Sequence, residues 1–133
     1  MGVWGHMKKT YLLLLLIVAC GQLLENLEAT EVSELYYNAI GQRQYATAYA
    51  LLGEEYRAAN NHATTLAKFS EEAESLLQSE GALRVVDVNE ISNDGVNAMV
   101  DVRVRRQWKS TQAVAVYLHR DDKAWRIIDV RAR

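Results

Sequence analysis

The spacing of apolar side chains changes once along this chain, at Gly81, and this change limits the fold more than any other feature. Before Gly81 apolar residues recur every three to four positions, which is typical of amphipathic helices. After Gly81 they alternate with polar residues, which is typical of strands with one buried face. Helices followed by consecutive strands predict an α+β domain, with the helices packed on an antiparallel sheet.

Three helices are expected before Gly81. The apolar stripe of the first consists of Val32, Leu35, Tyr36, Ala39 and Ile40, and Gly41 ends this helix. The stripe of the second consists of Tyr45, Ala48, Tyr49, Leu52 and Tyr56, and Gly53 is a candidate interruption. The stripe of the third consists of Leu66, Phe69, Ala73, Leu76 and Leu77, with Thr64 or Thr65 as its N-cap.

Four strands are expected after Gly81. The first is Leu83–Ile91, and Asn93-Asp94-Gly95 is a strong hairpin turn after it. The second alternates Ala98, Val100, Val102 and Val104 with Met99, Asp101, Arg103 and Arg105. The third carries Val114, Val116 and Leu118, and the fourth is Trp125–Val130. Short turns between successive strands predict an antiparallel meander.

Three segments carry a resemblance to a known family. They are Leu35-Tyr36-Tyr37-Asn38-Ala39-Ile40, Tyr45-Ala46-Thr47-Ala48-Tyr49-Ala50-Leu51-Leu52 and Trp125-Arg126-Ile127. They resemble motifs of bacterial lipoproteins of unknown function, and the order of elements looks like the nuclear transport factor two-like (cystatin-like) cone. The resemblance covers roughly residues 30–131 and implies three helices packed on a curved four-stranded sheet. Arg43-Gln44 stands where that family has a Gly-Asp pair, and the glycine is displaced to Gly41.

The N-terminus resembles the signal peptide and lipobox of a bacterial lipoprotein. Lys8 and Lys9 precede the apolar run Tyr11–Ala19, and the only cysteine, Cys20, follows it. The run has nine residues, and a spanning helix needs about 20. Ile17-Val18-Ala19-Cys20 matches the lipobox, which implies cleavage after Ala19 and a diacylglyceryl thioether on Cys20.

This resemblance divides the chain into three parts. Residues 1–19 are expected to be a signal peptide, 20–26 a short lipid-anchored tether and 27–133 the nuclear transport factor two-like domain. Either Met1 or Met7 is the start of the signal. The domain is expected on the extracytoplasmic side of the cell membrane or outer membrane, held by palmitate-type acyl chains on Cys20.

Charge is distributed unevenly along the domain. Residues 25–80 carry ten acids and three bases, whereas residues 81–133 carry seven acids and ten bases. The basic half is expected to be a solvated face or a surface for anionic headgroups or cell-wall polymers. Nucleic acid is not expected as a partner, because the domain is expected to lie outside the cytoplasm.

Motifs for catalysis, metal binding and cofactor binding are missing from the sequence, so no catalytic, cofactor or metal residue is expected. Enzymes of the cone fold place an acid or base inside the cavity, with tyrosines nearby. The corresponding candidates are Asp101, His119, Tyr36, Tyr49 and Tyr117. Asp101 alternates with the valines of its strand and is therefore expected to point outward.

The sequence favours a non-catalytic envelope-binding or interaction domain. The expected pocket between helices and sheet is lined by Tyr36, Tyr49, Tyr117 and Trp125. The expected partners are the membrane, through the lipid on Cys20, and a small apolar ligand or an envelope protein; a homodimer through the sheet face is a further alternative. Two other functions stay open: a small enzyme of the isomerase or dehydratase type, and a surface-exclusion or immunity lipoprotein.

Overall fold

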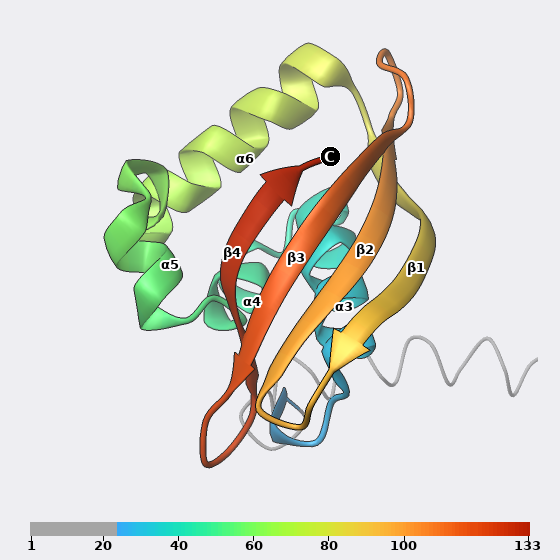
Figure 1. Cartoon of the computed structure of the whole chain (residues 1–133). Helices are drawn as coiled ribbons and strands as arrows, with labels where there is room; N and C mark the ends of the chain where they lie inside the picture. The colour runs from blue at the N-terminus through green and yellow to red at the C-terminus, as the bar shows by residue number, and fades with distance from the viewer. Residues whose placement is uncertain (1–23) are drawn as a thin grey trace, which may run out of the picture.

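The computed structural model describes residues 24–133 (Figure 1). In this range four complete α-helices and one 3₁₀ helix precede four strands. The helices are α3 (Ala29–Gly41), α4 (Tyr45–Ala50), α5 (Glu54–Ala59), η1 (Asn61–Ala63) and α6 (Leu66–Glu80). The strands are β1 (Leu83–Asn93), β2 (Asn97–Arg106), β3 (Gln112–Arg120) and β4 (Trp125–Ala132). The α+β class is confirmed. The expected lipid site at Cys20 lies outside the described residues.

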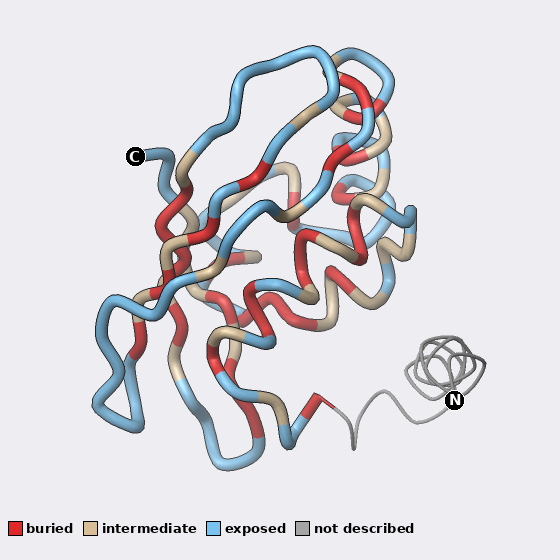
Figure 2. Tube along the Cα trace, turned by 90° about the vertical axis from the view of Figure 1, so that its right-hand side faces the viewer, coloured by how far each residue is buried: buried red, intermediate tan, exposed pale blue. Residues whose placement is uncertain are grey.

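The strands form one antiparallel sheet in the order β1-β2-β3-β4, as the alternation predicts. Its inner face is apolar, and its buried side chains on β2 and β3 are Ala98, Val100, Val102, Val104, Val114, Val116 and Leu118. The sheet bends around α3, which packs on β1, β2 and β4 (Figure 1). The buried stretches lie where helices and sheet face each other (Figure 2). The expected meander of four strands is therefore confirmed.

The expected number of three helices is wrong, because the second one is interrupted. Helix α4 ends at Ala50 and α5 begins at Glu54. Between them Leu52 pairs with Ile127 of β4 in an isolated parallel bridge. The Gly53 amide donates to the Ile127 carbonyl at 2.8 Å, and the Ile127 amide donates to the Leu51 carbonyl at 2.9 Å. These hydrogen bonds satisfy backbone groups on the free edge of β4, and this pairing outweighs the local helical periodicity.

The expected ends of α6 and the expected turn of the first hairpin are confirmed, although β1 continues to Asn93 where its end was expected at Ile91. The Thr65 side chain caps α6 by accepting a hydrogen bond from the Lys68 amide at 3.1 Å. Gly81 ends the helix with a φ of +88°, and Gly95 adopts +90° in the β1–β2 turn. Leu66, expected on the buried stripe of α6, is 40% exposed because it lies at the start of the helix.

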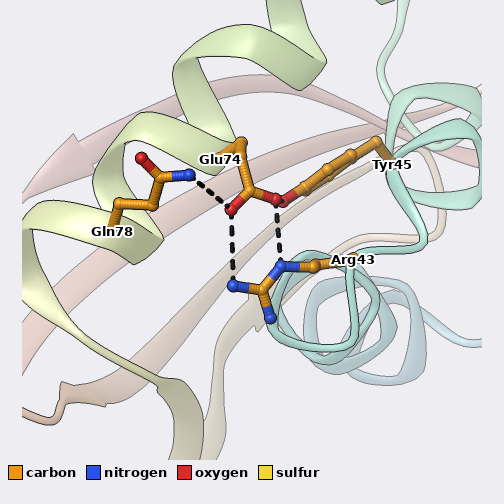
Figure 3. Close-up of polar contacts among 4 residues, drawn as sticks. All are labelled: Arg43, Tyr45, Glu74 and Gln78. Carbon is orange, nitrogen blue, oxygen red and sulfur yellow. Dashed lines mark hydrogen bonds and ion pairs between the residues drawn. The ribbon is translucent and has the colours of Figure 1, made fainter.

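A polar cluster ties the α3–α4 loop to α6 (Figure 3). Glu74 accepts hydrogen bonds from Arg43 Nε at 2.9 Å and from the Tyr45 hydroxyl at 2.8 Å. The bond from Arg43 holds the pKa of Glu74 below its ordinary value. Arg43 has a φ of +61°, which is unfavourable for any residue except glycine. The residue that forms the ion pair with Glu74 therefore has a strained backbone conformation.

The folded domain includes residues close to the expected lipid site. Leu24 is 4% exposed and belongs to the hydrophobic core, although it falls within the expected tether. None of the helices among residues 24–133 is long and apolar enough to cross a bilayer.

Candidate functional site

The four residues expected to line a pocket do not lie on the same side of the sheet. Tyr36 and Trp125 are 5% and 4% exposed and belong to the core, which Tyr49 borders from α4. Tyr117 lies on the outer face, because it alternates along β3 with the buried residues Val116 and Leu118. The Arg131 guanidinium lies over its ring, at 5.3 Å from the centroid. Tyr117 therefore does not share a site with the other three.

Aromatic rings pack closely in the space that the sequence assigned to the pocket. The Tyr36 ring lies 4.9 Å from that of Tyr37, edge to face, and 6.2 Å from that of Phe69. The Tyr49 ring lies 5.6 Å from Phe69, and its hydroxyl donates to the Ala63 carbonyl at 3.1 Å. Such spacing is typical of packed aromatic clusters. At these residues the interior is therefore a core of interlocking rings.

The buried tyrosines predict sensitivity to alkali. Burial raises the pKa of Tyr36, Tyr37 and Tyr56, because the charged form loses its hydration. A raised folded-state pKa contributes stability that is fully present below the unfolded value of about 10 and is lost as pH rises further. We expect tyrosinate absorbance and the loss of circular dichroism to appear together in one alkaline transition. Complete tyrosine ionisation with the circular dichroism unchanged would contradict this assignment.

A cleft of about 520 Å³ lies between α5 and the β3–β4 hairpin. We call it the α5 cleft. The charged residues and the histidine that line it are Glu54, Glu55, Arg57, His119, Asp121 and Arg126. The bridge between Leu52 and Ile127 brings the start of α5 against β4 and so assembles these side chains. His119 and Arg126 face each other across the β3–β4 ladder. Residues from both halves of the chain therefore meet in one polar cleft.

Both arginines of the α5 cleft have an N–H group without a hydrogen-bond acceptor among the described residues. Arg57 Nη2 donates to the Tyr49 carbonyl at 2.8 Å, and its guanidinium carbon lies 4.2 Å from the Tyr49 ring centroid. Arg57 Nε and Arg126 Nη1 are buried without a hydrogen-bond partner among the described residues. A buried donor without an acceptor costs about 1–3 kcal/mol, and more when it is charged.

The acidic side chains of the α5 cleft form no ion pair with these arginines among residues 24–133. Asp121 Oδ1 accepts the backbone amides of Ala124 and Lys123, each at 2.8 Å, and these bonds lower the pKa of its carboxyl group. Glu54 and Glu55 are exposed in the first turn of α5. Within residues 24–133, neither Arg57 nor Arg126 forms an ion pair. The charge of Arg126 also lowers the pKa of the Asp121 carboxyl group, so these two groups interact through space without forming an ion pair.

Four other arginines of the described region form ion pairs, whereas Arg84, Arg103, Arg105 and Arg120, like Arg57 and Arg126, form none. The ion pairs are Arg43–Glu74, Arg106–Glu80, Arg131–Asp129 and Arg133–Asp101. Arg106 also has a buried Nη1 without a partner, but its Nε lies 3.1 Å from Glu80. Asp101 is half-buried on the outer face, where alternation placed it, and lies 3.2 Å from Arg133. Asp101 is therefore held outside the core.

The other candidate, His119, lies at the α5 cleft on the strand face opposite the buried valines. Its Nδ1 lies 3.0 Å from Asn97 Oδ1. Because an amide oxygen only accepts, Nδ1 carries the proton in this hydrogen bond. No group of three His, Cys, Asp or Glu side chains within residues 24–133 is arranged to hold a metal ion. The α5 cleft thus brings a histidine and two arginines together.

Comparisons with solved structures identify the fold. A protein of unknown function with a cystatin-like fold from Nostoc punctiforme aligns with a TM-score of 0.55 and 8% identity, over 80% of this chain and 92% of the other. Bd1075 of Bdellovibrio bacteriovorus aligns with a TM-score of 0.55 and 9% identity over 76% of this chain. The alignment spans only 38% of Bd1075, less than half of its length.

A SEC-C motif-containing protein from Rhodopseudomonas palustris aligns with a TM-score of 0.50 and 14% identity, over 77% of each chain. No protein-family model matches this chain, and no curated protein matches it either. At these identities the similarity concerns the fold alone. The domain therefore has a cystatin-like α+β fold, and its function has to be argued from its own residues.

Proposed function

We propose that this chain is a lipid-anchored binding domain on the extracytoplasmic side of the cell envelope, of the nuclear transport factor two-like type and without catalytic activity. Lys8, Lys9, the apolar run Tyr11–Ala19 and the lipobox cysteine Cys20 support the anchor. The order of helices before a curved antiparallel sheet supports the fold type.

The observation that carries the binding function is the α5 cleft. It combines a volume of about 520 Å³ with two arginines that have no ion-pair partner among residues 24–133. The interior that was expected to take an apolar ligand is occupied, around Tyr36 and Trp125, by packed side chains. A polar ligand in the α5 cleft therefore fits the geometry better than an apolar ligand inside the cone.

The anchor would keep the domain close to the bilayer. Leu24 belongs to the hydrophobic core and follows Cys20 by four residues. Four residues reach at most about 14 Å, because an extended chain spans about 3.3–3.6 Å per residue. The ligand would thus be bound near the membrane surface.

Loss of the sulfur at Cys20 is expected to abolish anchoring. A thioether requires a cysteine, so Cys20→Ser cells should incorporate no labelled palmitate into this protein, and its signal peptide should stay uncleaved. The measurement is metabolic labelling followed by mass spectrometry of the N-terminus, with wild type as the positive control. Acylation of the serine variant at the wild-type level would refute the proposed anchor.

A small envelope enzyme is a second candidate, because His119 lies in the same cleft as the two arginines. Native mass spectrometry of a ligand that copurifies with the full-length protein distinguishes the two functions. A binding domain returns the ligand unchanged after incubation. An enzyme converts it, and that conversion should disappear in His119→Ala.

A further inference from the structure

We infer that the α5 cleft is a site for a phosphate-type oxyanion held by Arg57 and Arg126, either free phosphate or the phosphate of a lipid headgroup. The inference deepens the proposed function and rests on it for the location of the site near a membrane. The chemistry of the site itself is argued from the residues that line it.

The guanidinium groups are the first argument. A guanidinium presents several N–H donors in a planar fork that matches the oxygens of phosphate and carboxylate groups. Arg57 uses one of its donors for the Tyr49 carbonyl and leaves Nε buried without an acceptor. Arg126 likewise leaves Nη1 buried without an acceptor. These two donor atoms are themselves buried, so negative charge in the cleft would act on them through the charge of the two guanidinium groups.

The rigidity of the site is the second argument. Arg57 is held against the Tyr49 ring at 4.2 Å and by its bond to the Tyr49 carbonyl. An arginine side chain fixed in this way loses less rotamer entropy when a ligand binds. Arg57 is therefore preorganised for an anion, and Arg126 adds a second cation to the lining of the same cleft.

The carboxylates of the cleft decide how selective the site is. The Asp121 carboxylate accepts hydrogen bonds from two backbone amides of its own turn. Glu54 and Glu55 are exposed to water. Three carboxylates in the lining prevent a broad positive field, so attraction depends on direct contact with the guanidinium groups. A compact oxyanion is thus favoured over a long polyanion.

The position of the cleft connects it to the membrane. Asp121 belongs to the β3–β4 turn, which lies at the same end of the molecule as the first described residues (Figure 1). The β1–β2 turn lies at this end as well. With the lipid on Cys20, this end would face the bilayer. The cleft would then be within reach of the phosphate of a lipid headgroup as well as of free phosphate.

The test is an NMR titration of the full-length, ¹⁵N-labelled protein in non-ionic detergent. One arm uses inorganic phosphate and the other glycerophosphoglycerol, the soluble headgroup of phosphatidylglycerol, both at constant ionic strength. We expect saturable shifts of the amides of Gly53–Arg57 and His119–Arg126 and of the Arg57 Nε–H group. Tighter binding of glycerophosphoglycerol indicates the headgroup as the source, and tighter binding of phosphate indicates free phosphate.

Three variants decide whether the arginines form the site. Arg126→Gln removes one cation and is expected to weaken binding about tenfold or more, because a hydrogen bond to a charged group is lost. Arg57→Gln should act in the same way and serves as the second variant if Arg126→Gln changes the folded spectrum. Arg103→Gln alters an exposed arginine on β2 and should leave the affinity unchanged.

Two results would overturn the inference: no saturable shift with either probe, or wild-type affinity in both Arg126→Gln and Arg57→Gln. The anchor is tested separately by acylation of Cys20. A chain that binds phosphate through these arginines but is not acylated would refute the proposed anchor and leave the oxyanion site standing. An acylated chain without anion binding would refute the site alone.

Discussion

Replacing Trp125 by alanine is expected to destabilise the domain by about 3–5 kcal/mol, as is usual when a large buried aromatic side chain is deleted. Trp125 is 4% exposed at the start of β4 and belongs to the hydrophobic core. Its removal leaves a cavity between helices and sheet that rigid neighbours fill only in part. Chemical denaturation of the variant and wild type measures the loss directly.

Trp108→Ala is the matched control for this prediction. Trp108 is 63% exposed in the β2–β3 turn, so its removal should change the free energy of unfolding by no more than about 0.5 kcal/mol. Equal effects of the two substitutions would show that Trp125 does not act as a core residue. A small loss at Trp125 together with weaker ligand binding would instead indicate an open pocket at this position.

Gly81→Ala is expected to have the second largest effect, about 2–5 kcal/mol, from two separate causes. Gly81 adopts a φ of +88°, where an L-residue is disfavoured by about 1–2 kcal/mol. A Cβ atom at this position would also lie 2.5 Å from Gln107 Cβ and 3.1 Å from the Trp108 ring. Overpacking of this kind usually adds about 1–3 kcal/mol. Thermal and chemical unfolding should both report the loss.

Gly95→Ala separates the two causes. Gly95 also has a positive φ, +90°, but no heavy atom lies within 4 Å of the Cβ that alanine would add. Only the conformational penalty of about 1–2 kcal/mol is therefore expected. If Gly81→Ala is no more destabilising than Gly95→Ala, the close contact with Gln107 does not limit this junction between α6 and β1.

The strands and the ends of α6 could be predicted from the sequence because their signals are local. Alternation along β2 identifies its buried valines, and the Thr65 cap acts within a single turn of helix. In the sequence, Gly53 was the only sign that the second helix is interrupted. Its cause is the pairing of Leu52 with Ile127, which lies far along the chain. Local periodicity contains no information about such a partner.

The candidate site depended on tertiary structure even more. Tyr36 and Trp125 were identified as inward-facing from periodicity and resemblance, but only packing shows that rings fill the space around them. Arg57 was not a candidate, because the residues that share its cleft on β3 and β4 lie far along the chain. It joins Arg126 of β4 in one cleft only when α5 packs beside that strand.

By itself, therefore, the sequence determined the order of helices and strands and which faces of β2 and β3 are buried, because both follow from side-chain spacing within one element. Tertiary structure alone decided that α4 and α5 are separate, that Tyr117 lies apart from Tyr36, and that Arg57 and Arg126 share a cleft. These features arise from backbone pairing and packing between distant segments. Such contacts stabilise the protein only after folding has brought those segments together.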